Sequence, residues 1–386
     1  MKVLVVSPYH GGSHAAWGEG LQRFSGHDLR LLTLPARFWK WRMHGGAVTL
    51  ARRFLATGWR PGVILATDML DLTTFLALTR RVTWHVPTVL YMHENQLTYP
   101  LPADGRTGPM RRQHGERDLH YVFVNFVSML AADRVLFNSR YHMDGFLEAV
   151  PRFLRHFPEY NELQSVDALR EKCGVLPVGV DFGRLALGDG KRPFPATDPP
   201  LILWNQRWEY DKNPEAFFRV LFLLADEGYS FQVALCGQQY GKRPSIFTTA
   251  IEKLGDRIIH VGHADLPTYR HLLWRATVTI STAHHEFFGI SILEAIYCHT
   301  FPLLPNRLSY PELIPESFHK LCLYEDEAAL MMKLRQILSD PTQGTAVARQ
   351  LASEIGRYHW ANIAPQYDAL FTELTHYPKH SAHSPN

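Results

Sequence analysis

The sequence predicts an α/β protein built from two doubly wound, Rossmann-like domains. Strand-length apolar runs alternate with helical stretches along the whole chain, a pattern typical of parallel sheets covered by helices on both faces. Each half opens on an apolar strand, at residues 2–7 and 201–204, that runs directly into a loop of glycines or charged residues. A chain of 386 residues is also long enough for two domains with a core each.

The expected strands are short apolar runs bounded by polar or glycine-containing segments. In the first half they span residues 2–7, 29–32, 63–66, 88–92, 135–138 and 175–177, and in the second half residues 201–204, 232–235, 258–260, 278–281, 301–304 and 320–323. The segment 183–200 is rich in Gly, Pro and Asp and is expected to be a linker. We therefore expect domains at 1–182 and 201–358, a helix at 359–376 and a flexible polar tail at 377–386.

The composition is that of an ordinary globular protein, with 46% apolar and 20% charged residues. No apolar run approaches the roughly 18 residues of a membrane span, and the N-terminal strand leaves no room for a signal peptide. The cysteines have no paired spacing, which predicts reduced thiols in a cytoplasmic protein and no metal site: Cys173, Cys236, Cys298 and Cys322.

Charge is distributed unevenly along the chain. Of the 40 lysines and arginines, 21 lie at or before Val180, against 15 of the 37 acidic residues. The first half has a balance of +6, and the rest, with 19 against 22, has a balance of −3. A polyanionic partner such as RNA suits the basic half, although proteins that never bind nucleic acid show asymmetry of this size too.

A glycine-containing loop follows the first strand and includes Gly11, Gly12, Ser13 and His14. Glycines let the backbone approach a ligand closely, and the N-terminus of the helix that follows favours an anion. These residues are therefore candidates for contact with a ligand. A tight strand–helix turn without a ligand is the alternative.

Cations and aromatic residues alternate over residues 37–42. Aromatic and guanidinium planes stack on unpaired bases, and cations bind phosphates, so this stretch is the best candidate for contact with RNA: Arg37, Trp39, Lys40, Trp41 and Arg42. A second basic stretch lies in a loop that contains Gly and Pro: Arg106, Arg111, Arg112, His114 and Arg117. A solvated basic surface is the alternative for both, and the tryptophans equally suit packing beneath a loop.

Three polar residues, His93, Glu94 and Asn95, follow the apolar strand at 88–92. In an open α/β sheet the carboxyl ends of the strands line the ligand crevice. These side chains are therefore candidates for a binding or catalytic site, although a single histidine in such a position is usually structural.

Arg207 and Lys212 lie in a loop between the strand at 201–204 and a helix expected from about Pro214. Arg offers a planar fork of donors and Lys a point charge, a pair that suits a diphosphate. We expect both side chains to face solvent in a cleft. Two surface cations in a turn are the alternative.

Glu286 and Glu294 stand eight residues apart at a strand–loop–helix junction. The helix is expected over residues 291–298, so Glu286 lies in the loop and Glu294 inside the helix. Free N–H groups at the start of the helix favour a phosphate, and the carboxylates suit sugar hydroxyls. The junction predicts a nucleotide-sugar site that includes Phe288, Gly289 and Ile290. Two glutamates on a solvated helix face are the alternative.

These cations and glutamates resemble the donor site of retaining GT-B glycosyltransferases of family four. A closer resemblance is to the tRNA-queuosine mannosyltransferase family, once described only as glycosyltransferase-like domain proteins. It rests on strings in both halves: residues 9–14, 34–42, 93–100, 206–215 and 281–289. The most specific are His-Glu-Asn-Gln at 93–96 and His-Glu-Phe-Phe-Gly at 285–289. Animal members carry a long polar insertion between the halves that this chain lacks, so it resembles a compact bacterial form.

The resemblance implies a GT-B fold, in which the two domains face each other across a cleft and the final helix returns to the first domain. It implies that Arg207 and Lys212 bind the donor diphosphate, Glu286 the donor sugar and Glu294 the nucleotide ribose. It places Gly11 and Gly12 near the donor phosphates and His93 beside the anomeric carbon. The other residues singled out in the first half would bind the acceptor: Ser13, His14, Arg37, Trp39, Lys40, Trp41, Arg42, Glu94, Asn95, Arg111 and Arg112.

The implied reaction is transfer of mannose from GDP-mannose, with retention, to queuosine in the anticodon of tRNA-Asp, without a cofactor, a bound metal or integral membrane association. The implied catalytic residues are His93, Arg207, Lys212 and Glu286. Composition and periodicity supply neither the mannose, the guanine nor the queuosine. Two alternatives stay open: a transferase of the same fold with a lipid or polysaccharide acceptor, and a non-catalytic RNA-binding protein on a transferase scaffold.

Overall fold

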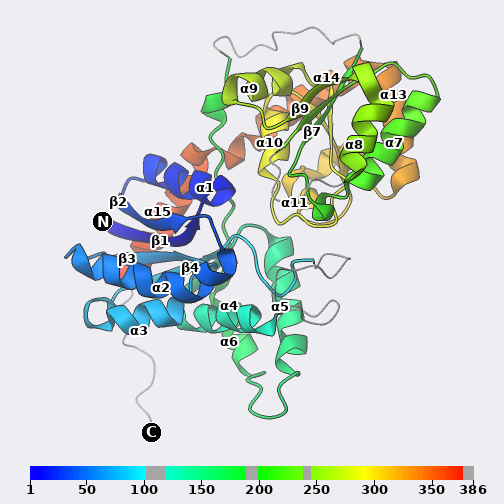
Figure 1. Ribbon diagram of the computed structural model, residues 1–386. Coiled ribbons are helices and arrows are strands. Elements are labelled where there is room, and N and C mark those ends of the chain that lie inside the picture. Colours follow the sequence, from blue (N-terminus) through cyan, green and yellow to red (C-terminus); the bar gives the residue numbers. More distant parts are fainter. Residues whose placement is uncertain (101–117, 188–198, 238–244, 377–386) are drawn as a thin grey trace. The chain divides into compact units, whose positions relative to one another are not determined.

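The computed structural model describes residues 1–100, 118–187, 199–237 and 245–376 (Figure 1). The chain divides into two compact units. Unit 1 comprises Met1–Gly179 together with Trp360–Asn386, and unit 2 comprises Val180–His359. Within the described ranges, each unit has a parallel six-stranded sheet, as the alternation of strands and helices in the sequence predicts.

The sheet of unit 1 has the strand order β2-β1-β3-β4-β5-β6. The strands are β1 (Lys2–His10), β2 (Asp28–Pro35), β3 (Val63–Thr67), β4 (Thr88–Met92), β5 (Arg134–Phe137) and β6 (Cys173–Val175). Because β1 lies between β2 and β3, the chain reverses its direction of growth there. The loops after β1, β3 and β4 therefore meet at the carboxyl edge of the sheet, where α/β proteins bind ligands.

Helices cover both faces of this sheet (Figure 1). They are α1 (Gly12–Phe24), α2 (Trp39–Ala56), α3 (Leu72–Thr83), α4 (Leu119–Ala131), α5 (Arg140–Leu154), α6 (Ser165–Lys172) and α15 (Trp360–His376). Leu4 and Val6 of β1 belong to one apolar core with residues of α2, α3 and α4. On the opposite face, Trp17 of α1 stacks on Tyr91 of β4 and donates a hydrogen bond to Tyr367 of α15 at 3.0 Å.

The sheet of unit 2 has the strand order β12-β11-β10-β7-β8-β9. The strands are β7 (Leu201–Asn205), β8 (Gln232–Cys236), β9 (Ile258–Gly262), β10 (Val278–Ile280), β11 (Phe301–Pro305) and β12 (Leu323–Tyr324). The chain grows outward from β7 to β9 and then returns to pair β10 with β7. The loops after β7 and β10 therefore leave from adjacent strands, at the switch point of this sheet.

The helices of unit 2 pack around this sheet (Figure 1). They are α7 (Pro214–Asp226), α8 (Ser245–Leu254), α9 (Leu266–Arg275), α10 (Ile290–Tyr297), α11 (Tyr310–Leu313), α12 (His319–Cys322), α13 (Glu327–Ser339) and α14 (Pro341–Glu354). Helix α7 begins at Pro214, where proline's missing N–H is harmless, and Asn213 caps it by accepting a hydrogen bond from the N–H of Ala216 at 3.4 Å.

Some expectations differ from the structure. The strand expected at 175–177 lies two residues earlier, at Cys173–Val175. The strand expected at 320–323 is wrong, because His319–Cys322 form the one-turn helix α12 and only Leu323–Tyr324 pair with β11. The linker expected at 183–200 is folded at its start, where Phe182–Leu185 form a 3-10 turn and Leu185 enters the core of unit 2. Residues 188–198 lie outside the described residues.

Candidate functional site

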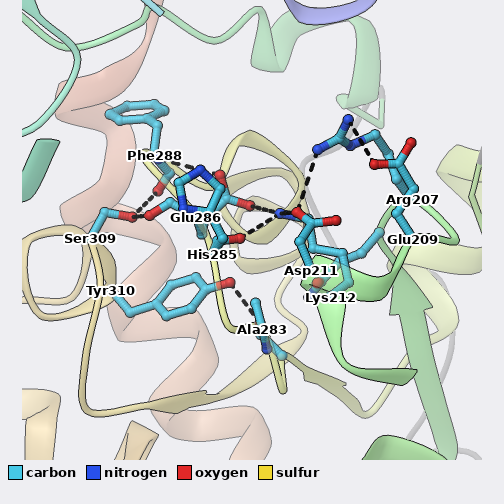
Figure 2. Close-up of polar contacts among 12 residues, drawn as sticks. Arg207, Glu209, Asp211, Lys212, Ala283, His285, Glu286, Phe288, Ser309 and Tyr310 are labelled. Carbon is cyan, nitrogen blue, oxygen red and sulfur yellow. Dashed lines mark hydrogen bonds and ion pairs between the residues drawn. The ribbon is translucent and has the colours of Figure 1, made fainter. Parts of the chain in front are cut away.

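Lys212 is the centre of a polar cluster in unit 2 (Figure 2). It ends a 3-10 turn, Tyr210–Lys212, in the loop after β7. Its Nζ lies 2.7 Å from the carbonyl oxygen of His285, 3.2 Å from Glu286 Oε2 and 3.1 Å from Asp211 Oδ2. The side chain is only 6% exposed. The expectation of a solvent-facing Lys212 is therefore wrong, since its ammonium is buried among three oxygen atoms.

Backbone hydrogen bonds join the loop after β7 to the loop after β10. The carbonyl of Asp211 accepts hydrogen bonds from the N–H groups of His284 and His285, at 2.8 and 3.2 Å. Thr282 Oγ1 donates to the carbonyls of Lys212 and Asn213, at 3.1 and 2.8 Å. These contacts fix the two segments that the sequence singled out against each other.

Arg207 lies at the edge of the same cluster (Figure 2). Its guanidinium is 42% exposed and is 3.3 Å from Glu209 Oε2 and 3.6 Å from Asp211 Oδ2. The carboxylate of Asp211 is fully buried between Arg207 and Lys212. Two cations thus share one buried anion, which leaves the guanidinium of Arg207 as the cation that a ligand in solvent can reach.

Glu286 is held as an anion by its surroundings. Burial by itself would raise the pKa of this carboxyl, but the Lys212 ammonium, the N–H of Phe288 and Arg207 bring the pKa below its ordinary value. The N–H of Phe288 donates to Glu286 Oε1 at 3.3 Å, and Ser309 Oγ donates to the carbonyls of Glu286 and Phe288 at 3.2 and 3.0 Å. The charged carboxylate is thus positioned to accept hydrogen bonds from hydroxyls.

Gly289 allows the loop to enter helix α10. Its φ is +106°, in the region that favours glycine. A Cβ there would lie 2.9 Å from Leu313 Cδ1 and 3.8 Å from Glu286 Cγ. The helix begins at Ile290, so the first N–H groups of α10 lack a partner within the helix and are available to an anion.

Glu294 lies in a separate network on the same helix. Its carboxylate is buried, pairs with Arg184 and accepts a hydrogen bond from Tyr269 Oη at 2.8 Å. Asn205, the last residue of β7, donates to Tyr269 Oη at 3.3 Å and to the carbonyl of Ser291 at 2.7 Å. Sequence reasoning missed Arg184 and Tyr269, because they lie 110 and 25 residues away from Glu294 and belong to no local motif.

His93 is the centre of a buried group in unit 1. Asp68, after β3, accepts its backbone N–H at 3.0 Å, and Asn138, after β5, donates to its carbonyl at 2.9 Å. Asn125 of α4 donates to the carbonyl of Asp68 at 2.9 Å. In the structure Asp68 and Asn138 also follow buried strands directly, but the strands expected at 63–66 and 135–138 did not place them there.

The imidazole of His93 is neutral at neutral pH. Burial, with the rings of His14 and His142 nearby, lowers the pKa of His93 well below its ordinary value. The rings of His14 and His93 lie 4.3 Å apart between centroids, and Trp17 contacts His93 edge-on at 4.7 Å. His93 Nε2 is buried and has no hydrogen-bond partner among the described residues.

The two residues after His93 differ in whether their side chains can contact a ligand. Asn95 is fully buried, and its Oδ1 accepts the N–H groups of Leu97 and Thr98 at 2.9 and 2.7 Å. It therefore shapes the turn and does not present its amide to a ligand. Glu94 is half-buried and accepts a hydrogen bond from Gln96 Nε2 at 3.1 Å.

The loop after β1 holds the remaining candidate residues at the carboxyl edge of the sheet of unit 1. Gly11 packs so closely on Ala36 that a Cβ would lie 2.5 Å from Ala36 Cβ. Gly12, with φ +53°, begins α1, and Ser13 and His14 form its first turn. The first N–H groups of α1 thus lie at the carboxyl edge of the sheet, as the glycines predict.

The segment 37–42 combines packed and exposed side chains. Trp39 is half-buried against Tyr121, with ring centroids 5.2 Å apart, whereas Arg37, Lys40 and Trp41 are exposed. Arg42 is half-buried and donates to the carbonyl of Pro35 at 3.2 Å. The second basic stretch, with Arg111 and Arg112, lies outside the described residues.

Across the residues that the structure describes, no three His, Cys, Asp or Glu side chains are grouped so that they could hold a metal ion. In the same ranges, no helix is long and apolar enough to cross a bilayer.

Comparison with known families assigns both halves of the chain. A model of the N-terminal part of tRNA-queuosine alpha-mannosyltransferases matches residues 2–180. A model of group 1 glycosyl transferases matches residues 190–356. The two matches correspond closely to the two units of the structure.

Individual relatives agree with these matches. A tRNA-queuosine alpha-mannosyltransferase from Drosophila melanogaster is 33% identical over 379 residues, which cover 96% of each chain. This animal relative therefore lacks the long insertion that was expected in animal members. A GDP-mannose:cellobiosyl-diphosphopolyprenol alpha-mannosyltransferase from Xanthomonas oryzae pv. oryzae is 24% identical over 65% of this chain and 61% of its own.

Among solved structures, a sucrose-phosphate synthase from Thermosynechococcus elongatus is similar in fold, with a TM-score of 0.70, 16% identity, and coverage of 97% of this chain and 99% of its own. At that identity the likeness concerns the fold alone. The expected fold class is confirmed, and the chain belongs to the tRNA-queuosine alpha-mannosyltransferase family and has the GT-B fold.

Proposed function

We propose that this protein transfers mannose from GDP-mannose, with retention of anomeric configuration, to queuosine in the anticodon of tRNA-Asp. The observation that carries the proposal is the 33% identity to a tRNA-queuosine alpha-mannosyltransferase over 96% of both chains. The protein would act in the cytoplasm, where its tRNA acceptor resides. Residues 1–182 would bind the acceptor and residues 201–358 the nucleotide sugar, joined by residues 183–200, with the helix at 359–376 supporting the acceptor half.

The donor diphosphate would bind at Arg207, Lys212 and the N-terminus of α10. As the sugar leaves through an oxocarbenium-like state, negative charge grows on the diphosphate, and preorganised cations and N–H groups stabilise it. The buried Lys212 already contacts Asp211 and Glu286, so a phosphate oxygen has to replace one of these contacts. These groups supply positive charge at the diphosphate, and the proposed reaction needs no resident metal or cofactor.

The two glutamates would bind different parts of the donor. Glu286 is anionic and held by Lys212, which suits hydroxyls of the transferred sugar. Glu294 would bind the ribose, with Arg184 and Tyr269 orienting its carboxylate. Gly289 and Ile290 would present backbone N–H groups to the phosphates, and Gly11 and Gly12 would do the same from α1. The N–H of Phe288 donates to Glu286 Oε1, so Phe288 would join them only after that hydrogen bond is replaced.

On the acceptor side, His93 would contact the reacting hydroxyl as a neutral imidazole, because its pKa is held low by burial. Its Nε2, which has no partner among the described residues, suits one hydrogen bond to that hydroxyl. Ser13, His14 and Glu94 would bind the acceptor nucleoside, while Asn95 shapes the loop.

The rest of the acceptor set would bind the tRNA outside the modified nucleoside. The exposed cations of residues 37–42 suit phosphates, and so do Arg111 and Arg112 by their charge. The exposed surface of residues 37–42 is distinct in chemistry from the buried His93 group, which suits a single hydroxylated ring.

One alternative has a specific observation behind it. The Xanthomonas relative is named for a polyprenol-linked acceptor, so a lipid acceptor is the rival reading. Purified protein given GDP-mannose with a labelled sugar, together with both total tRNA and a lipid extract, separates the two. We expect label in the tRNA fraction. Label in the lipid fraction alone would favour the rival, and label in neither, with no donor hydrolysis, would favour a non-catalytic RNA-binding protein.

A further inference from the structure

Phe38 has an unusual backbone conformation and an exposed ring. Its φ and ψ are 53° and 55°, in the left-handed region, and its side chain is 78% exposed. A bulky residue with positive φ is a strained exception. A residue whose backbone is strained and whose aromatic ring is exposed to water contributes little to the stability of the fold.

The surroundings hold Phe38 in place. The N–H of Arg37 donates to the carbonyl of Pro35 at 2.8 Å, and the N–H of Arg42 donates to the carbonyl of Phe38 at 3.1 Å. The guanidinium of Arg42 also donates to the carbonyl of Pro35. Trp39, packed on Tyr121, anchors the start of α2. The turn thus directs Phe38 outward while its neighbour Trp39 points inward.

Trp41 is a second exposed ring, and Gly45 provides space for it. Its side chain is 63% exposed. A Cβ at Gly45 would lie 2.6 Å from Trp41 Cζ2 and 2.7 Å from Cε2. The indole therefore lies along α2 over a position where only glycine leaves room, which leaves a flat ring accessible from solvent.

The surroundings of these rings are cationic. Arg37 and Lys40 are exposed beside them, and the exposed rings of His44 and His120 stack at 4.7 Å between centroids. Lys40 Nζ lies 5.5 Å from the ring centroid of Trp39. Flat aromatic rings among cations suit stacked bases and their phosphates.

We propose that Phe38 and Trp41 form a platform on which unpaired bases of an RNA stack, with Gly45 as the seat of the Trp41 indole. The platform rests on the proposed function only in that its partner is an RNA. The platform goes beyond the proposed function because it assigns the stacking role to Phe38 and Trp41 and gives Trp39 a packing role. An unpaired stretch of RNA fits better than a membrane surface, because two separated rings interleaved with charges do not make a continuous apolar face.

The test is binding of a fluorescent hairpin RNA with the sequence of the tRNA-Asp anticodon arm, lacking queuosine, and of the same hairpin with abasic loop positions. We expect Trp41→Ala and Phe38→Gly each to weaken binding of the intact hairpin roughly tenfold, the scale of one lost base stack. Binding of the abasic hairpin should change little. The slope of log affinity against log salt should be unchanged, because no phosphate contact is lost. Melting temperatures should not fall, since glycine suits the positive φ of position 38.

Gly45→Ala separates stacking from folding. Alanine favours a helix over glycine, so stability should hold or rise while the displaced indole weakens hairpin binding. Gly145→Ala is the matched control, because a Cβ at this position of α5 meets nothing within 4 Å. Trp84→Ala controls for loss of an exposed tryptophan, since Trp84 is 66% exposed at the end of α3. Both controls should bind RNA as wild type does.

Hairpin binding that is equal for wild type, Trp41→Ala and Gly45→Ala would overturn the platform. So would binding of anionic phospholipid vesicles that depends on Trp41 while RNA binding does not. The assay needs neither GDP-mannose nor queuosine, so its outcome is separate from that of the proposed function. If the protein binds the hairpin through Trp41 but transfers no mannose, the platform proposal stands and the proposed function is wrong.

Discussion

Arg207 and Lys212 carry the same charge in very different surroundings. Lys212 is buried and forms ion pairs with Asp211 and Glu286, whereas Arg207 is half-exposed. Breaking a buried ion pair by removing one partner leaves an uncompensated charge and costs about 3–5 kcal/mol. A half-exposed pair contributes little to stability.

The first prediction follows from this contrast. Arg207→Ala should lower turnover by about 10²-fold or more, as loss of one transition-state charge partner does, with little change in the free energy of unfolding. Lys212→Ala should lower both turnover and stability. Steady-state kinetics and urea unfolding measure the two effects. Arg219→Ala is the control. It removes an exposed arginine of α7 that pairs with Glu327, and it should change neither turnover nor stability. Wild-type turnover in Arg207→Ala, or wild-type stability in Lys212→Ala, would contradict the assignment.

The second prediction separates the two glutamates. Glu294→Gln should weaken binding of GDP, because the ribose contact is present without a sugar. Glu286→Gln should leave GDP binding nearly intact and impair binding or transfer of mannose. Isothermal titration calorimetry with GDP and with GDP-mannose checks both. An equal loss of GDP affinity in the two variants would show that the roles are misassigned.

The third prediction concerns His285. Burial, with the Lys212 ammonium, lowers the pKa of His285 to about 4, below its unfolded value of about 6.5. The unfolded chain therefore binds the proton first on acidification, and the stability contributed by the neutral imidazole is lost as pH falls from about 6.5 towards 4. Between about pH 7 and pH 5, wild type should lose roughly 2 kcal/mol more than His285→Gln does.

Urea unfolding at the two pH values measures this difference. The low pKa of Glu286 acts in the same direction, but only below its unfolded value of about 4.3, so it does not interfere above pH 5. His44→Gln, which removes an exposed histidine, should follow wild type. Parallel pH profiles for wild type and His285→Gln would contradict the burial argument.

At the residue scale the sequence could predict candidate site residues but not how they are paired. Arg207, Lys212 and Glu286 stand in recognisable local patterns, and the structure brings them together. The partners of Glu294 could not be predicted, because Arg184 approaches it from 110 residues away. The burial of Lys212 also depends on the distant loop after β10, which no spacing within its own segment reveals.

At the scale of elements, the donor site depends on two loops joined by backbone hydrogen bonds and on the turn at Gly289. The fourth prediction tests that turn. Gly289→Ala combines positive φ with a clash against Leu313, and an overpacked methyl costs about 1–3 kcal/mol in addition to the backbone strain. Gly228→Ala has a similar φ, +84°, but meets nothing within 4 Å.

Urea unfolding and turnover of the two variants compare these costs. Gly289→Ala should be the less stable variant and should also lose turnover, because the shifted loop moves Glu286 and the start of α10. Gly228→Ala should lose only the stability that an alanine with positive φ costs. Equal effects in both variants would mean that the turn at Gly289 has no special role in the site.

Element positions were largely predictable because strands here are buried apolar runs that end in polar or glycine residues. The strand at Thr88–Met92 was predicted to the residue. The strand expected at 320–323 was wrong because Cys322 is buried within a single helical turn while Leu321 is exposed, and one turn is too short to show a helical period. The β1 strand continues to His10, three residues beyond the expected end.

At the scale of the molecule, the alternation of strands and helices predicted the fold class, and the family strings in both halves predicted the family. The structure adds which residues belong to each unit. Helix α15 is last in sequence yet belongs to unit 1, where Tyr367 accepts a hydrogen bond from Trp17. A contact across 350 residues is invisible to local pattern.

The central claim concerns the acceptor of the transferred sugar. The measurement that tests it most directly is nucleoside mass spectrometry of tRNA-Asp after incubation with the protein and GDP-mannose. Two pools are compared, one from cells that make queuosine and one from cells that do not. We predict a gain of one hexose on queuosine in the first pool and no change in the second, with the gain reduced by about 10²-fold or more in Arg207→Ala. Hexose added to both pools, or to neither while wild-type protein still consumes GDP-mannose, would contradict the account.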